Sequence, residues 1–323
     1  MSGRLRQTVR KTIFLLVLCG AGICRAGEPS PNAIQILATV RAEIKRDHLT
    51  FQAGYSAVLE CSIADLGRGL VIPPDIQERI RRHHIWSLEL EKAIGRSAPL
   101  PRYGSPTDPS FNWRDSDHVT LVRRQGCCCQ ACLAFSALGA YEGSFLIRNP
   151  SSTPETVHAS EQEVINCSGC CSCTCGGTDP GAVLRFLVYH GTASARTIPY
   201  QGVDLPCNPT VPITYKARNA DYVNQLVDIP PTNEIKKALI AHGPLSACVY
   251  IDTAFLAYAR GVFNHTAFNQ VNHAVTLVGW DDSKNAWLIK NSWGTDWGEG
   301  GYMWIAYNCH SIGKYAAWCD AMP

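Results

Sequence analysis

Hydrophobic residues recur at helical spacing in the first third of the chain. One predicted helix has its apolar face on residues three or four positions apart: Ala33, Leu37, Val40 and Ile44. A second helix is predicted to begin after Asp75, which can cap it, with Glu78 three residues later as in a capping box. Residues 96–106 contain four prolines or glycines and no periodicity, which predicts a linker.

After the linker, helical patterns come first and strand patterns second. Apolar residues from Leu133 to Phe145 predict a buried helix that must end at Asn149-Pro150, and further helices are expected at 161–166 and 180–190. From about residue 245, short β-like runs are separated by Gly, Asn and Asp turns, at 246–251, 273–278, 286–289 and 302–305. Helices followed by strands in one chain indicate an α+β fold of two lobes.

The composition is that of a globular, exported protein. The chain has 323 residues, is 46% hydrophobic and carries a formal net charge of +2, which gives no electrostatic reason to expect nucleic-acid binding. Its one long apolar run, Ile13 to Cys24, is too short to span a bilayer. Basic residues precede this run and small residues follow it, which predicts a signal peptide over residues 1–26, with a membrane anchor as the alternative.

Three residue types suited to acyl transfer stand at informative places. Cys132 directly precedes the predicted helix at Leu133, where the helix dipole favours the thiolate, so its pKa is expected to be strongly depressed. His273 begins an apolar strand, and Asn291 lies in Lys290-Asn291-Ser292-Trp293-Gly294. A cysteine nucleophile, a histidine base and an amide that orients the histidine are the parts of a cysteine acyl-transfer site.

These residues resemble the papain-like cysteine peptidases, a family that includes the cathepsins. The resemblance extends from about Asp108 to the end of the chain. The motifs that carry it are, in chain order, Phe111-Asn112-Trp113-Arg114, Gln125-Gly126, Cys129, Cys132-Leu133-Ala134-Phe135-Ser136, Gly176-Gly177 and the block from Asn291 to Tyr302. It implies a two-lobed α+β fold, with a helical lobe, a β-barrel-like lobe and the active-site cleft between them.

The resemblance also implies a role for each matched residue. Cys132 would be the nucleophile, His273 would pair with it as imidazolium, and Asn291 would orient the imidazole under the ring of Trp293. Gln125 and the Cys132 backbone N–H would hold the oxyanion. The substrate-binding residues that it implies are Gly176, Gly177, Thr178, Cys248, Val271, Ala274 and Trp293, with an S2 subsite suited to a medium-sized apolar side chain.

The chain departs from the family pattern near the nucleophile. Leu133 stands where the family almost always has Trp, so the packing of the cleft is expected to differ. Gln125 lies seven residues before Cys132, one more than usual, and Gln130 is a possible substitute donor. Gln130 also replaces a family glycine beside the S1 subsite.

Residues 27–106 are interpreted as an inhibitory pro-segment of the peptidase domain at 107–323. The first three positions of the family's helical pro-segment motif are matched by Glu78, Arg82 and Trp86. The next three positions would be Glu89, Ala93 and Ser97, which do not match. An independent helical adaptor is the alternative. His83-His84 could sense pH, although a solvated helix face is the favoured interpretation.

Sixteen cysteines are many for a chain of this length, and export would allow disulfides. By resemblance, Cys129 pairs with Cys173 and Cys167 with Cys207, and Cys309 and Cys319 are candidates for a third pair. The alternative is a metal cluster, because two groups have ligand spacing: Cys167, Cys170 and Cys173, and Cys129 and Cys132. Disulfides are favoured, because no histidine joins these cysteines.

The expected function is that of a secreted zymogen of a cysteine endopeptidase, with a catalytically silent peptide-binding relative as the alternative. The expected partners are protein or peptide substrates and the chain's own pro-segment, without a cofactor, a metal, nucleic acid or, after signal cleavage, a membrane. A monomer is expected in an extracellular, periplasmic or lysosome-like compartment. Five histidines without an identifiable partner are expected to be structural: His118, His158, His190, His242 and His310.

Overall fold

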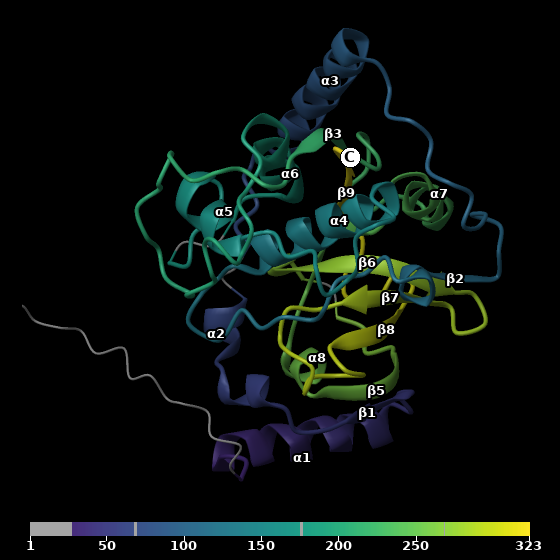
Figure 1. Cartoon of the computed structure of the whole chain (residues 1–323). Coiled ribbons are helices and arrows are strands. Elements are labelled where there is room, and N and C mark those ends of the chain that lie inside the picture. Colours follow the sequence, from purple (N-terminus) through teal and green to yellow (C-terminus); the bar gives the residue numbers. More distant parts are fainter. Residues whose placement is uncertain (1–27, 68–69, 175–176, 268) are drawn as a thin grey trace, which may run out of the picture.

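The computed structural model describes residues 28–67, 70–174, 177–267 and 269–323 (Figure 1). The expected signal peptide at 1–26 and the expected substrate-binding Gly176 lie outside the described residues. Among the described helices, none combines the length and the apolar character needed to cross a membrane.

The N-terminal segment consists of short elements in the order α1 (Pro31–Arg46), β1 (Phe51–Ala53), the 3-10 helix η1 (Ala57–Glu60), α2 (Ile63–Leu66) and α3 (Ile76–Ile94). The Ser30 hydroxyl caps α1 by accepting a hydrogen bond from the Ala33 N–H. Helix α3 begins after Asp75 as predicted. The Asp75 carboxylate, however, accepts from Arg79 Nε at 2.8 Å and does not cap the helix.

A helical layer follows the linker and is formed by α4 (Cys132–Arg148), α5 (Glu161–Cys167) and α6 (Pro180–Tyr189). Helix α4 ends at the Asn149 C-cap as predicted, and nearly all of its residues are buried. Its small residues allow close packing, because a Cβ on Gly139 would overlap Thr276 and a Cβ on Gly143 would overlap Pro244. The helix that begins with Cys132 therefore lies directly against the sheet.

The described strands, β1 of the N-terminal segment included, form one mixed sheet. Their order is β1-β5-β8-β7-β6-β4-β9-β3, with β2 paired to β6. The predicted strands correspond to β4 (Leu245–Val249), β6 (His273–Asp281), β7 (Ala286–Lys290) and β8 (Tyr302–Ala306). Not predicted were β2 (Ser110–Asn112), η2 (Trp113–Ser116), β3 (Ala217–Tyr222), α7 (Thr232–His242), α8 (Thr253–Leu256), β5 (Tyr258–Phe263) and β9 (Lys314–Ala321). The α+β fold expected from the sequence is confirmed.

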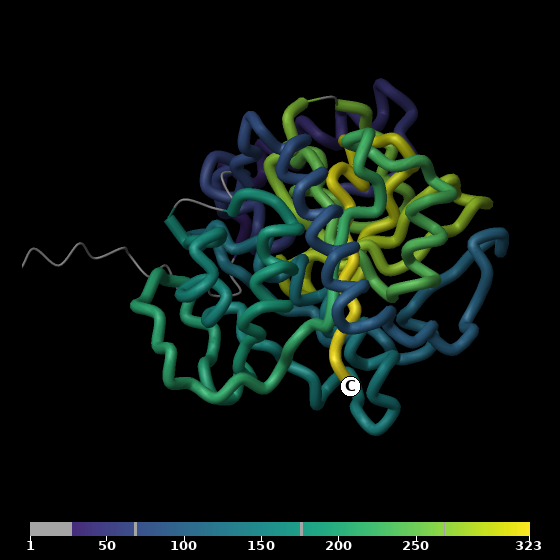
Figure 2. The backbone as a smooth tube through the Cα atoms, turned by 90° about the horizontal axis from the view of Figure 1, so that it is seen from above, coloured from purple at the N-terminus to yellow at the C-terminus, as the bar shows by residue number. Residues whose placement is uncertain are grey.

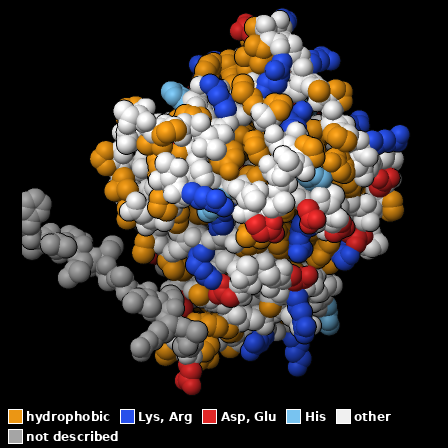
Figure 3. Space-filling view, in the orientation of Figure 1, with side chains coloured by type: hydrophobic (Ala, Val, Ile, Leu, Met, Phe, Trp, Pro, Cys, Tyr) orange, Lys and Arg blue, Asp and Glu red, His pale blue; other side chains and the backbone are white. Residues whose placement is uncertain are grey.

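The N-terminal segment extends along the molecule from one end to the other (Figure 1). Strand β1 pairs antiparallel with β5 at the sheet edge, with Phe51 opposite Gly261. At the opposite end α3 packs against β3, and in the view from above it lies over the C-terminal strand (Figure 2). On the face seen in Figure 3, basic and acidic side chains are interspersed, in keeping with the small net charge.

Three disulfides are present among the described residues. Two are the pairs implied by the resemblance, Cys129–Cys173 and Cys167–Cys207. The metal-cluster alternative is therefore wrong for these cysteines, because their sulfurs are bonded to each other. The suggested pairing of Cys309 with Cys319 is also wrong, since neither is in a disulfide. The third bond, Cys61–Cys127, was not predicted, and it joins the N-terminal segment to the loop before α4.

The interpretation of His83-His84 as a solvated face is wrong. His83 is buried against β3, and its Nε2 donates to the Ala220 carbonyl at 3.0 Å. His84 Nδ1 lies 2.6 Å from Asp221 Oδ2. Burial lowers the pKa of His83 from 6.5 to about 4, so it is uncharged when α3 is docked. Because undocked His83 would bind a proton more readily, its contribution to docking is lost as the pH falls from about 6.5 towards 4.

Candidate active site

Cys132 is the first residue of α4 and lies where that helix meets the sheet. Ala131 is the N-cap, and the Cys132 side chain is fully buried. The backbone N–H of Ala274 donates a hydrogen bond to the Cys132 sulfur. Ala274 is the second residue of β6, so this bond brings the sulfur beside the start of the strand that carries His273.

Asn291 fixes both the orientation and the tautomer of His273. The Asn291 Oδ1 accepts from His273 Nε2 at 2.9 Å and from the Ser292 N–H at 2.8 Å. Since this oxygen can only accept, the imidazole proton is on Nε2 and Nδ1 has the lone pair. Nδ1 is buried and has no hydrogen-bond partner among the described residues. The ring of Trp293 covers the imidazole, with 4.8 Å between the ring centroids.

Burial keeps both Cys132 and His273 uncharged in this structure. It raises the pKa of the Cys132 thiol to about 12 and lowers the pKa of His273 to about 4. Backbone N–H groups near the sulfur, that of Ala274 among them, and the Asn291 hydrogen bond to the imidazole act in the opposite direction. The expected depressed pKa of Cys132 is therefore wrong for this state, because loss of hydration outweighs the helix N-terminus.

The described part of the N-terminal segment contacts the site at two places. A Cβ on Gly67 would lie 3.0 Å from Asn272 Nδ2, next to His273. Leu70 forms a parallel bridge with Gly177, and the Val71 N–H donates to the Gly177 carbonyl at 2.8 Å. The described residues on both sides of 68–69 thus contact opposite sides of the site.

The apolar residues expected to bind substrate are close together. Cys248 lies opposite Ala274 in the register of β4 and β6. Both belong to one buried cluster with Val271 and with Leu70 of the N-terminal segment. Leu70 is 6% exposed, so the N-terminal segment contributes a buried apolar side chain to the same cluster as the predicted S2 residues.

On the helical side, Gly177 packs against Leu133. A Cβ on Gly177 would lie 2.5 Å from Leu133 Cδ2, so the aliphatic side chain at 133 requires glycine here. Thr178 donates its backbone N–H to the Cys170 carbonyl, and its hydroxyl is buried without a hydrogen-bond partner in the described structure.

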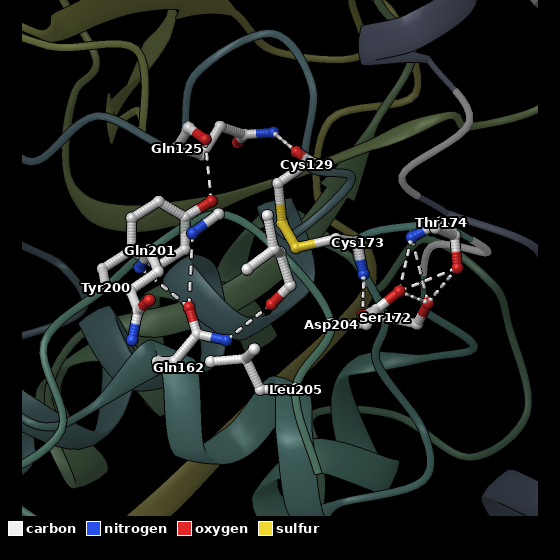
Figure 4. Close-up of a disulfide and its surroundings, with 12 residues drawn as sticks. Gln125, Cys129, Gln162, Ser172, Cys173, Thr174, Tyr200, Gln201, Asp204 and Leu205 are labelled. Carbon is white, nitrogen blue, oxygen red and sulfur yellow. Dashed lines mark hydrogen bonds between the residues drawn. A yellow bond between two sulfur atoms is a disulfide. The ribbon is translucent and has the colours of Figure 1, made fainter. Parts of the chain in front are cut away.

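Gln125 is held between the loop before α4 and the segment that carries Asn291. Its Nε2 donates to the Cys129 carbonyl at 3.2 Å (Figure 4), and its Oε1 accepts from the Ser292 hydroxyl at 2.6 Å. The loop is fixed by the Cys129–Cys173 disulfide and by the Gln130 N–H, which donates to the Cys173 carbonyl. The hydrogen bond to the Cys129 carbonyl uses one of the two protons on Gln125 Nε2 and does not use the other.

Sequence reasoning missed a charged network beneath the site. The Arg123 guanidinium lies 2.7 Å from the carboxylates of both Glu142 on α4 and Glu161 on α5. Lys290 precedes Asn291 and donates to the Thr120 hydroxyl at 3.0 Å, and burial lowers its pKa to about 8. These residues are far apart in sequence and match no motif, so no signal in a single sequence could have grouped them.

Known proteins share this sequence and architecture. The family model described as papain family cysteine protease matches residues 107–319. The cysteine proteinase RD21A of Arabidopsis thaliana is 33% identical over 254 residues, which are 75% of this chain and 52% of that protein. Cathepsin J of Mus musculus is 37% identical over 213 residues, 60% of this chain and 59% of that protein. The chain thus spans between about half and three fifths of the length of these curated relatives.

Solved structures of cysteine proteases have a similar fold. Digestive procathepsin L2 from the larval midgut of Tenebrio molitor has a TM-score of 0.69 at 24% identity, covering 91% of this chain and 95% of that one. The cysteine protease CMS1MS2 of Carica candamarcensis, solved in complex with E-64, has a TM-score of 0.55 at 30% identity, covering 66% of this chain and 98% of that one. The fold, the match over residues 107–319 and the arrangement around Cys132 lead to one conclusion: the chain belongs to the papain family of cysteine proteases.

Proposed function

We propose that the chain is the secreted zymogen of a cysteine endopeptidase, with a signal peptide at 1–26, a pro-segment at 27–106 and a peptidase domain at 107–323. The observation that carries the proposal is the tautomer of His273. Asn291 holds its proton on Nε2, which leaves the Nδ1 lone pair as the acceptor for the thiol proton of Cys132. A merely structural histidine has no need of a buried nitrogen without a partner.

In the proposed reaction, removal of the N-terminal segment admits water and substrate, which lowers the cost of charge in the site. The proton moves from the Cys132 sulfur to His273 Nδ1, and the thiolate attacks the peptide carbonyl carbon. The Cys132 backbone N–H and the second proton of Gln125 Nε2 stabilise the oxyanion. The His273 imidazolium then protonates the leaving amine, and water hydrolyses the thioester.

The pro-segment contacts suggest both inhibition and specificity. The Val71 N–H donates to the Gly177 carbonyl and Leu70 forms a bridge with Gly177, as a substrate backbone would. The described part of the segment, however, places no peptide bond at Cys132 for cleavage. The burial of Leu70 with Cys248, Val271 and Ala274 favours a medium-sized apolar side chain at P2.

The nucleophile is tested by comparing Cys132→Ser with Cys128→Ser, a matched change at an exposed cysteine. Peptide hydrolysis and labelling by E-64 are measured on protein freed of its pro-segment. Cys132→Ser should reduce turnover by at least about 10³-fold with an unchanged Tm, because serine is nearly isosteric but forms no thiolate. Cys128→Ser should retain activity. Full activity in Cys132→Ser, or a folded and released wild-type protein without hydrolysis or labelling, contradicts the proposal.

The role of Asn291 predicts opposite shifts in the pH profile. Its hydrogen bond favours protonated His273, so Asn291→Ala should lower the imidazolium pKa and move the alkaline limb of kcat/KM to lower pH. Asn291→Asp adds a negative charge beside the ring and should move that limb to higher pH. Equal shifts in the two variants would show that Asn291 does not act through His273.

The Cys61–Cys127 disulfide adds a second requirement for activation. Cys61 lies before the linker at 96–106, and Cys127 lies five residues before Cys132. Cleavage of the linker therefore leaves the pro-segment covalently bound beside the nucleophile. Its release then needs a thiol reductant, which converts the disulfide into two protein thiols and is itself oxidised to a disulfide.

Gel electrophoresis tests this requirement. After linker cleavage, the wild-type pro-segment should migrate with the peptidase domain without reductant and separate from it with reductant. The double variant Cys61→Ser/Cys127→Ser should separate in denaturant without reductant, whereas Cys128→Ser should behave as wild type. A reductant also breaks the other disulfides, whereas the double variant removes only the Cys61–Cys127 bond, so it shows the effect of that bond alone. Separation of cleaved wild-type chains in denaturant without reductant would refute the covalent link.

A further inference from the structure

Asp252, His265 and His310 converge from three segments that the catalytic site does not use. Asp252 caps α8, His265 follows β5, and His310 lies in the turn between β8 and β9. His310 Nε2 lies 3.1 Å and His265 Nδ1 lies 3.2 Å from one oxygen, Asp252 Oδ2. All three atoms lie within 4.8 Å of one another.

Hydrogen bonds around this cluster orient its ligand atoms towards one another. Asp252 Oδ1 accepts from the Phe255 N–H at 2.9 Å, which leaves Oδ2 facing the histidines. The Cys309 sulfur lies 2.7 Å from the His265 carbonyl, which can only accept, so the thiol donates there. The sulfur also lies 3.5 Å from His310 Nδ1. His310 Nε2 donates to Asp252 Oδ2 at 3.1 Å, because a carboxylate oxygen can only accept, so this nitrogen points at the same oxygen as His265 Nδ1.

His265 Nδ1 is the buried, unsatisfied atom among the three ligand atoms of this cluster. It is buried and, despite its distance of 3.2 Å from Asp252 Oδ2, it has no aligned hydrogen-bond partner in the described structure. One carboxylate oxygen therefore has two ring nitrogens within 3.2 Å, and of these only His310 Nε2 forms an aligned hydrogen bond with it.

We propose that Asp252, His265 and His310 bind one divalent transition-metal ion, with Zn²⁺ as the best fit. Zinc bonds of about 2.0–2.1 Å in a tetrahedron place ligand atoms about 3.3 Å apart. The two distances to Asp252 Oδ2 are 3.1 and 3.2 Å, and the two ring nitrogens lie within 4.8 Å of each other, so binding draws the histidines together. The His310 side chain is 0% exposed, whereas His265 and Asp252 are 24% and 17% exposed, so the ion enters from their side and water fills the fourth position. The contact between His310 Nδ1 and Cys309 supplies the outer-shell bond that orients a ligating histidine.

The backbone of the turn supports a fixed role for His310. Asn308, His310 and Ser311 all have positive φ, at 61°, 49° and 55°, in the left-handed region that side chains other than glycine rarely adopt. Such geometry persists only where surrounding contacts hold it, and a metal bond to His310 is one such contact.

The proposed ion would also fix the connection that leads to His273. His265 lies near the start of the β5–β6 connection and Asn272 at its end. The Asn272 side chain accepts from the Ile251 N–H at 2.7 Å and donates to the Ile251 carbonyl at 3.1 Å. Asp252 directly follows Ile251. The metal at Asp252 and the Asn272 amide at Ile251 would therefore anchor both ends of the β5–β6 connection to these two neighbouring residues. The ion is therefore structural, and it stabilises the segment that positions the catalytic base.

The test uses the full proenzyme with Cys132→Ser, which removes the catalytic thiol as a competing ligand and prevents self-cleavage. Binding of Zn²⁺ is measured by equilibrium dialysis and metal analysis, and Co²⁺ is used for its ligand-sensitive visible spectrum. Asp252→Asn removes the negative ligand but retains an N-cap side chain, and His265→Ala removes a partly exposed ligand. His190→Ala, an exposed histidine away from the cluster, is the matched control.

We expect one equivalent of metal, a Co²⁺ spectrum without thiolate charge transfer, and a Tm increase of about 5–10 °C at a hundredfold excess over Kd. Asp252→Asn and His265→Ala should each weaken binding at least about tenfold, and His190→Ala should not. Absence of binding at micromolar metal, equal binding in the ligand variants and the control, or thiolate charge transfer would each overturn the proposal. An apo cluster held by a protonated histidine would give the first of these results.

Discussion

The close packing of α4 against β6 is the constraint on which the candidate site depends. Cys132 belongs to the helix, and His273 belongs to the strand, so their separation is set by the distance between these two elements. Gly139 permits that distance, since a Cβ there would overlap Thr276. The Ser136 hydroxyl, one turn after Cys132, lies 2.6 Å from the Ser246 hydroxyl and donates to the Val275 carbonyl at 2.7 Å. A polar contact in a dry interface fixes register as well as distance.

The same burial that aligns the site also keeps it uncharged. A thiol with a pKa near 12 beside an imidazole with a pKa near 4 is a neutral pair at every physiological pH. The N-terminal segment contributes to this state because Gly67, Leu70 and Val71 contact both sides of the site. Inhibition in this account has two parts, a cleft already filled and a low-dielectric site in which the ion pair cannot form. In this account, both the filling of the cleft and the low dielectric of the site are lost when the N-terminal segment is removed.

Much of the fold was predictable because its patterns are local. Helices α1, α3 and α4 and strand β6 show their periodicity within a few residues, and the positions of Cys132, His273 and Asn291 follow from short motifs. Strand β3 was missed because its sequence, ARNADY, is polar although it is mostly buried, and its polar groups are satisfied by α3 and β9. Strand β5 contains Gly261, which is unfavourable in a strand interior but allows close approach of Thr50.

The errors in the site have a different origin, because they concern contacts between distant segments. The Cys61–Cys127 bond spans 66 residues, and one of its partners lies outside the part that resembles the family. The pKa of Cys132 was expected to be low from the helix N-terminus and the pairing with His273, whereas burial of the thiol raises it. His310 was interpreted as structural without a partner, since its neighbours Asp252 and His265 come from two other segments.

The most direct test of the account is the pH dependence of iodoacetamide modification at Cys132, followed by mass spectrometry of its peptide in two states. In the intact proenzyme, modification should be slow below pH 10, because the thiol is buried and neutral. After linker cleavage, reduction of Cys61–Cys127 and removal of the pro-segment, the rate at pH 6–7 should rise at least about a hundredfold, with a thiolate already formed below pH 7. Rapid modification in the intact proenzyme, or an equally slow rate after the pro-segment is removed, would contradict the account.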